Sequence, residues 1–164
     1  MADDASDAPR AADLVGAWEL VAFRELDDEG GGTSDGPLGP DATGLLIYAP
    51  DGVVSVSMMR RGSRHPGAAG PAGEQPRTTA YMGYAGTWRL EGTRLLHHVE
   101  VSTHTYQLGQ DLEREVCLRG DRLDLVGRAP VDGRCRRRVL TWRRRAPGSA
   151  GEVPNAPRST GGPG

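Results

Sequence analysis

Hydrophobic and polar residues alternate along most of the chain, and the alternating runs come in pairs joined by glycine-containing turns. The central pair covers residues 81–102 and is interrupted at Glu91-Gly92. A period of two on either side of a two-residue turn predicts a β-hairpin. Its expected register places Gly86 opposite His97 and Trp88 opposite Leu95. The mostly apolar face of this hairpin, which should point to a core, carries Tyr84, Gly86, Trp88, Leu95, His97, Val99 and Val101.

The same pattern predicts further strands on both sides of this hairpin. Residues 14–25 form the first expected strand, and residues 135–145 form the last. A hairpin at 44–60 turns at Asp51-Gly52, and a hairpin at 112–127 turns at Gly120-Asp121. The expected pairs are Leu45–Met58, Ile47–Val56 and Ala49–Val54 in the former, and Arg114–Gly127, Val116–Leu125 and Leu118–Leu123 in the latter. No segment has a convincing helical period.

Eight strands in a meander predict an all-β fold, an antiparallel up-and-down barrel that closes on itself and so has no sheet edges. The three tight turns fall at one end and four longer connections, residues 61–80 among them, fall at the other. One end should therefore be closed and the other open. The expected apolar floor at the closed end consists of Trp18, Val54, Trp88, Leu95, Leu118, Leu123 and Trp142. Higher on the inward face we expect Met58, Tyr84, His97, Arg114 and Arg138, with Arg24 and Arg60 at the rim.

Closure makes the first and last strands neighbours, and their facing ends carry opposite charges. Residues 25–29 are acidic, whereas residues 134–138 are rich in arginine. The two runs either complement each other across this seam or are unrelated solvated charges.

Composition indicates how far the folded domain extends and in which compartment the protein is located. Residues 1–12 and 146–164 lack large apolar residues or are rich in Pro, Gly, Ser and Ala, so we expect disordered tails around one domain at 13–145. The net charge of −2 argues against broad nucleic-acid binding. No stretch has the length of a membrane span or the features of a signal peptide, which indicates the cytoplasm and free thiols at Cys117 and Cys135.

Several stretches in this order resemble the lipocalin-like domain family of small bacterial and fungal proteins. They are GAWELV at 16–21, GLLIYAPDGVVSVSM at 44–58, YAGTWRLEG at 84–92, HHVEVS at 97–102, RGDRLDL at 119–125 and LTWRR at 140–144. The resemblance covers nearly the whole expected domain and implies a lipocalin-like barrel. Where such proteins tend to carry a Pro-Asn-Trp-like segment, this chain has His104-Thr105-Tyr106, a departure at the mouth. Barrels of this kind include ligand carriers and cyclases, so the fold alone does not select one.

Three inward polar residues are the catalytic candidates. His97 has a side chain that can act as a general acid or base, or it is a buried neutral histidine with a hydrogen-bonded neighbour. Arg114 can orient a carboxylate, enolate or phenolate, or it serves an internal ion pair or a rim position in water. Tyr84 can donate to the same ligand, or it is an aromatic wall residue.

The expected function is binding of an apolar or amphiphilic small molecule, such as a natural-product or polyketide intermediate, in the cavity. The remaining expected ligand-binding residues are Trp18, Met58, Trp88, Arg138 and Trp142. The alternative is a cofactor-independent cyclase or isomerase of secondary metabolism. The histidines and cysteines have no zinc-site spacing, and no glycine-rich phosphate motif opens a helix, so we expect neither a metal nor a cofactor. The pattern also gives no reason to expect a nucleic-acid or membrane partner.

Overall fold

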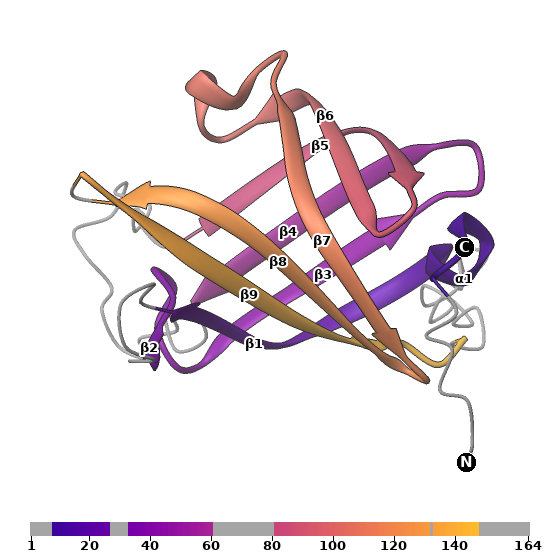
Figure 1. Cartoon of the computed structure of the whole chain (residues 1–164), viewed down its shortest axis with the longest axis horizontal. Helices are drawn as coiled ribbons and strands as arrows, with labels where there is room; N and C mark the ends of the chain where they lie inside the picture. Colours follow the sequence, from indigo (N-terminus) through magenta and orange to yellow (C-terminus); the bar gives the residue numbers. More distant parts are fainter. Residues whose placement is uncertain (1–7, 27–32, 61–80, 132, 148–164) are drawn as a thin grey trace, which may run out of the picture.

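The chain folds into a closed antiparallel β-barrel (Figure 1). The computed structural model describes residues 8–26, 33–60, 81–131 and 133–147. The elements of these residues are, in chain order, α1 (Ala11–Leu14), β1 (Gly16–Leu26), β2 (Thr33–Asp35), β3 (Ala42–Tyr48), β4 (Val53–Arg60), β5 (Tyr81–Glu91), β6 (Arg94–Ser102), the 3-10 turn η1 (Thr105–Gln107), β7 (Asp111–Arg119), β8 (Arg122–Val131) and β9 (Arg134–Arg144).

The barrel consists of eight of these strands. Strands β3 to β9 pair with their neighbours in chain order, and β1 pairs with β3 on one side and with β9 on the other. This confirms the predicted all-β, eight-stranded up-and-down barrel. The additional strand β2 pairs with residues 24–26 of β1, on the edge that β3 leaves free beyond Glu19. The expected connection at residues 61–80 lies outside the described residues.

The β7–β8 hairpin has the predicted register. Val116 pairs with Leu125 and Leu118 with Leu123, because Gly120-Asp121 forms the two-residue turn that the sequence indicates. Strand β8 extends beyond its predicted end at Gly127, and it pairs with β9 as far as Val131 and Arg134. The connection between them is therefore residues 132–133, not a long loop.

The β3–β4 hairpin differs from its predicted register by one residue. Leu46 pairs with Val56 and Tyr48 with Val54. The turn is longer than Asp51-Gly52, because the Ala49 N–H donates to the Val53 carbonyl at 2.9 Å and Gly52 takes a positive φ of 91°. A loop that ends in a left-handed glycine shifts the register relative to a two-residue turn. Since side chains alternate in a strand, a shift of one residue turns the other set inward.

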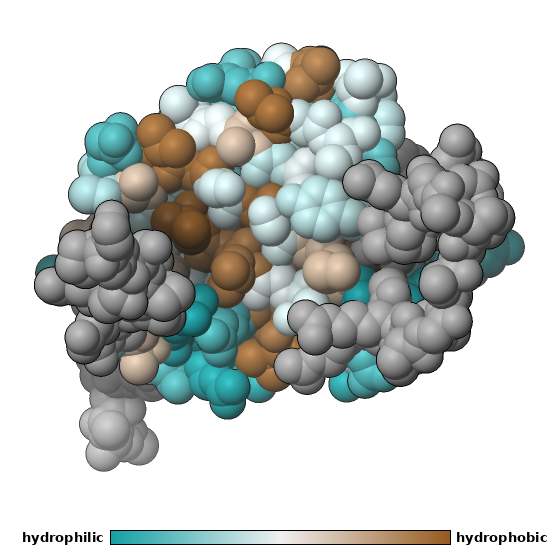
Figure 2. Space-filling view, turned by 180° about the vertical axis from the view of Figure 1, so that it is seen from behind, coloured by the Kyte–Doolittle hydropathy of each residue, from teal (hydrophilic) through white to brown (hydrophobic). Residues whose placement is uncertain are grey.

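This shift in register changes which side chains of β3 are buried. Leu46 and Tyr48 are buried, whereas Leu45 and Ile47, which were predicted to face the core, are exposed. Seen from behind, the outer surface of the barrel carries several apolar areas (Figure 2). The exposed apolar side chains of β3 and β4 are Leu45, Ile47, Val53 and Met59.

The β5–β6 hairpin turns one position later than predicted, at Gly92-Thr93, which moves each cross-strand partner by two residues. Trp88 pairs with His97 and Gly86 with Val99, so the predicted faces are kept but the partner of His97 is not a glycine. A β-bulge between Ala85 and Gly86 then reverses the alternation. As a result Val101, predicted to face inward, is exposed. Gly86 is needed at the bulge, since a Cβ there would lie 1.9 Å from the His98 carbonyl oxygen.

A second bulge, between Leu20 and Ala22 of β1, changes the predicted alternation of the first strand. Trp18 is buried as expected, but beyond the bulge Phe23 and Glu25 face inward and Arg24 is exposed. Arg60, the other residue expected at the rim, is also exposed and donates to the Leu38 carbonyl.

The tight-turn end of the barrel is closed by apolar side chains, as predicted. Trp18, Val54, Leu95, Leu123 and Trp142 are buried, and the half-buried Trp88 and Leu118 pack against them. The short helix α1, which was not predicted, lies at this end (Figure 1) and buries Leu14. The predicted tail boundary at residue 12 falls within this helix, and most of the predicted tail residues, 1–7 and 148–164, lie outside the described residues.

Candidate functional site

A cavity of about 700 Å³ lies inside the barrel. It extends from Trp142 near the closed end to residues 104–107 around η1 at the other end. Its apolar lining comes from strands on all sides, namely Phe23, Leu46, Val56, Met58, Met82, Leu112, Leu125 and Leu140. This volume and this lining are typical of small-molecule sites.

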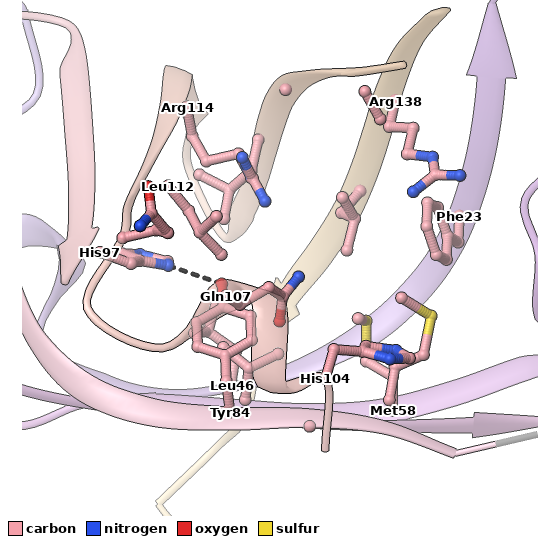
Figure 3. Close-up of a pocket in the computed structure, with 18 of the residues that line it drawn as sticks. Phe23, Leu46, Met58, Tyr84, His97, His104, Gln107, Leu112, Arg114 and Arg138 are labelled. Carbon is pink, nitrogen blue, oxygen red and sulfur yellow. Dashed lines mark hydrogen bonds between the residues drawn. The ribbon is translucent and has the colours of Figure 1, made fainter. Parts of the chain in front are cut away.

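Three polar residues of the cavity lining are gathered on one wall. Tyr84, His97 and Arg114 come from the neighbouring strands β5, β6 and β7, and they lie together on one side of the cavity (Figure 3). Phe23, Met58 and Arg138 lie across from them. The structure therefore brings together the three catalytic candidates that the sequence indicated.

His97 is held between two tyrosines. Its Nδ1 lies 2.7 Å from the Tyr84 hydroxyl, and its Nε2 lies 2.9 Å from the Tyr48 hydroxyl. His97 and Tyr48 are each only 1% exposed, whereas Tyr84 is half-buried and lines the cavity. Both nitrogens of the imidazole thus have a hydrogen-bond partner inside the barrel.

All three rings of this group are neutral at pH 7. Burial, together with the positive charge of Arg114, lowers the pKa of His97 to about 3. Burial raises the pKa of Tyr84, and it raises that of Tyr48 well above its usual value, although the Arg114 charge opposes both shifts. The group therefore supplies hydrogen bonds to the cavity but no charge.

Arg114 supplies the positive charge of the wall. Its side chain lies against Gly127 of β8, where a Cβ would come within 2.8 Å of the guanidinium Nη1. The guanidinium donates to the Glu113 carbonyl at 2.8 Å. Among the described residues no carboxylate forms an ion pair with Arg114, so the alternative of an internal ion pair has no partner in this part of the chain.

Arg138, across the cavity, differs from Arg114 because its charge is paired. It contacts the buried carboxylate of Glu25 at 2.8 Å, and Arg136 approaches the same carboxylate at 3.7 Å. These contacts cross the β1–β9 seam, where the sequence indicated complementary charges. The guanidinium of Arg138 also lies 6.0 Å from the centre of the Phe23 ring.

The mouth carries a further polar group. Gln107 of η1 accepts a hydrogen bond from the Ser102 hydroxyl at its Oε1, at 2.8 Å. The Ser102 oxygen in turn accepts from the His104 N–H at 2.9 Å, which ties η1 to the end of β6. The Gln107 amide reaches into the cavity (Figure 3), and its nitrogen has no hydrogen-bond partner among the described residues.

The expected ligand-binding residues divide into two groups. Met58, Arg138 and Trp142 line the cavity. Trp18 and Trp88 do not line it: the Trp18 indole donates to the Leu14 carbonyl, and the Trp88 indole donates to the Ala49 carbonyl. Those two tryptophans belong to the closed end.

Sequence reasoning missed Tyr48, Phe23 and Gln107. The loop at Pro50-Asp51-Gly52 is the signal that could have placed Tyr48 inward, since a proline before Asp-Gly lengthens the turn. The bulge that turns Phe23 inward has no comparable signal in the alternation of β1. The position of Gln107 also has no signal in the sequence, because it depends on the conformation of η1.

Neither a metal centre nor a membrane-spanning helix is found in the described part of the chain. Its His, Cys, Asp and Glu side chains do not gather in groups of three or more that could hold a metal ion. No helix in these ranges has the length and apolar character needed to cross a membrane.

A closed eight-stranded barrel with a sealed end and a largely apolar cavity has the form of a small-molecule-binding barrel. A family model described as a lipocalin-like domain matches residues 15–145, which is most of the chain. The chain belongs to this lipocalin-like domain family, as its sequence stretches indicated. A search of curated proteins gave no match.

Proposed function

We propose that the barrel binds an apolar or amphiphilic small molecule, of the kind found among natural-product and polyketide intermediates, in its internal cavity. The observation that carries this proposal is the cavity itself, about 700 Å³ of space lined largely by apolar side chains together with a few polar groups. A domain that only needed a stable core would fill this space, because protein interiors pack to high density. We place this activity in the cytoplasm, without a cofactor.

A pair of variants on one strand tests the proposal. Met58 faces the cavity and is buried, whereas its neighbour Met59 faces outward and is exposed. Met58→Trp should fill part of the cavity and weaken binding of a polarity-sensitive dye at least tenfold, whereas Met59→Trp should leave binding unchanged. Equal binding by both variants would place the dye outside the barrel. In a separate experiment, native mass spectrometry of the purified protein should detect a small molecule that is retained in the cavity.

The second candidate function is a cofactor-independent cyclase or isomerase of secondary metabolism. It is supported by one arrangement, the positive charge of Arg114, which pairs with no carboxylate in the described ranges, beside the Tyr84–His97 pair. Such groups can stabilise negative charge that develops on a substrate oxygen. If this function is right, His97→Ala should slow turnover with little change in affinity. A biosynthetic gene cluster around the gene would favour this candidate.

A further inference from the structure

The hydrogen-bonded chain Tyr48–His97–Tyr84 has a direction that can be worked out by counting protons. A neutral imidazole has one N–H and one nitrogen lone pair. Both ring nitrogens of His97 contact a tyrosine hydroxyl. One tyrosine must therefore donate to the ring, and the other must accept from it.

Burial decides which tyrosine donates. Tyr48 is 1% exposed, does not line the cavity, and has no other hydrogen-bond partner for its hydroxyl among the described residues. If it accepted from His97, its own proton would be buried without a partner, which is costly. Tyr48 therefore donates to Nε2, and Nδ1–H donates to the Tyr84 oxygen. The Tyr84 proton is then left over, and Tyr84 lines the cavity.

The polar groups beside Tyr84 are also donors. Arg114 has only N–H groups and one backbone acceptor, the Glu113 carbonyl, in the described ranges. The Gln107 oxygen is taken by Ser102, which leaves its amide N–H₂ for the cavity. Asp111, a carboxylate in the lining, is already held by His98 at 2.8 Å and by Arg89 at 3.3 Å.

We propose that this wall recognises a negatively charged oxygen (an enolate, phenolate or carboxylate) on an otherwise apolar ligand, with Tyr84, Arg114 and Gln107 as donors. The inference rests on the proposed binding function and deepens it. Tyr48 and His97 are positioning residues, because both His97 ring nitrogens already contact tyrosine hydroxyls and the pair fixes the direction in which the Tyr84 hydroxyl donates. A ligand that only donates hydrogen bonds would leave these three donors without a partner.

Three naphthalenes of similar shape test the ligand class by calorimetry or by dye displacement. The probes are 2-naphthoate, which carries an anionic oxygen, 2-acetylnaphthalene, which carries a neutral acceptor, and 2-ethylnaphthalene, which carries none. We expect the affinity to fall in that order. Tyr84→Phe should weaken the first two by about tenfold, the loss of one hydrogen bond, and leave the third unchanged. Tyr81→Phe is the matched control, because Tyr81 lies on the same strand, is exposed and contacts Ser57 on the outer face.

The outcomes separate this inference from the proposed function. If all three probes bind the wild type equally and lose the same affinity in Tyr84→Phe, the cavity binds ligands but the inference is wrong. If no probe binds, including the hydrocarbon, and Met58→Trp changes nothing, the proposed function is wrong.

The proton direction has a test that needs no ligand. Nitrogen-15 NMR of the histidine ring distinguishes a protonated Nδ1 from a protonated Nε2. We expect His97 in the protein to be the Nδ1–H form at pH 7 and still neutral at pH 5. An Nε2–H form would reverse the chain, direct the Tyr84 proton to His97 and overturn the inference.

Discussion

The floor of the barrel and the polar wall of the cavity each contain a fully buried residue with a polar ring, Trp18 and His97, but the hydrogen bonds of these two rings end in different places. On the floor, Trp18 is fully buried and its indole N–H ends on the Leu14 carbonyl, inside the fold. On the wall, His97 is 1% exposed, but its hydrogen bonds lead through Tyr84 to the cavity. The buried fraction of a side chain therefore does not distinguish structural residues from ligand-facing ones. The place where its hydrogen bonds end does distinguish them.

This difference assigns separate energetic roles to the two regions. The floor gains stability from apolar area removed from water and from the Arg144 guanidinium, which lies 4.1 Å above the Trp18 ring and donates to the Val15 and Asp13 carbonyls. The wall buries polar groups whose net contribution to stability is small. Changes on the floor should alter stability without altering ligand preference, and changes on the wall should do the reverse.

The largest effect is expected from Trp18→Ala. Removing a fully buried indole from the floor should lower the free energy of unfolding by about 3–5 kcal/mol, as measured by urea denaturation. Trp88→Ala, at a half-buried position, should cost clearly less. The preference of the folded variants among the three naphthalenes should not change. A loss below about 1 kcal/mol for Trp18→Ala would mean that the floor does not hold the barrel closed.

The next effect is a pH dependence caused by His97. Its pKa is about 3 in the folded protein, against about 6.5 for an unfolded histidine. Between these values the unfolded chain binds a proton that the folded protein does not, so stability is full above pH 6.5 and falls as the pH drops. From pH 7 to pH 5 the contribution of His97 should fall by about 2 kcal/mol.

The comparison that isolates this contribution uses His97→Gln. The other titrating groups are common to both proteins, so the wild type should lose about 2 kcal/mol more than the variant between pH 7 and pH 5 in urea denaturation. Between pH 7.5 and pH 8.5 the two curves should run parallel. Parallel curves down to pH 5 would show that His97 titrates in the barrel as it does in the unfolded chain.

Arg114→Leu should affect the wall alone. Loss of a charge-assisted hydrogen bond should weaken 2-naphthoate by about 1.5–3 kcal/mol and barely change 2-ethylnaphthalene. The melting temperature should hardly fall, because no carboxylate in the described ranges depends on Arg114. The matched control is Arg94→Leu, since Arg94 pairs with Glu113 on exposed side chains. Equal losses for both ligands would remove Arg114 from anion recognition.

The fold was predictable from sequence because alternation and turns specify strands and their order. The register was predictable only where the turn chemistry was simple. At Gly120-Asp121 a two-residue turn gave the right pairs, whereas the longer loop ending at Gly52 moved β3 by one residue. That single step replaced Leu45 and Ile47 with Leu46 and Tyr48 on the inner face.

The site was predictable to the extent that a polar residue stands out on an apolar strand face. His97, Tyr84 and Arg114 do so, and the structure places them on one wall. Tyr48 does not stand out in the sequence, because it lies 49 positions from His97 and an aromatic residue is common on an apolar strand face. The proton direction needs both tyrosines, the burial of one and the cavity beside the other, and these are properties of the folded barrel.

Two of the arginines that line the cavity, Arg114 and Arg138, sharpen the comparison further, since they differ in their counter-charges. Arg114 has no carboxylate partner in the described ranges, whereas Arg138 shares Glu25 with Arg136. Glu25 is 8% exposed, and its contact with Arg138 at 2.8 Å neutralises the charge that Arg138 would present to a ligand. The anion preference should therefore depend on Glu25, although Glu25 itself does not line the cavity.

Glu25→Gln is expected to have the smallest effect, and its sign is informative. The amide keeps an oxygen that can accept from Arg138 but removes the negative charge, so the cavity becomes more positive. Affinity for 2-naphthoate should rise about two- to fivefold, the scale of a partly exposed ion pair, and affinity for 2-ethylnaphthalene should stay constant. Glu19→Gln is the matched control, because Glu19 lies on the same strand as Glu25 and pairs with Arg145 where both side chains are exposed. A fall in naphthoate affinity in Glu25→Gln would show that Glu25 orients Arg138 for the ligand, and does not merely neutralise it.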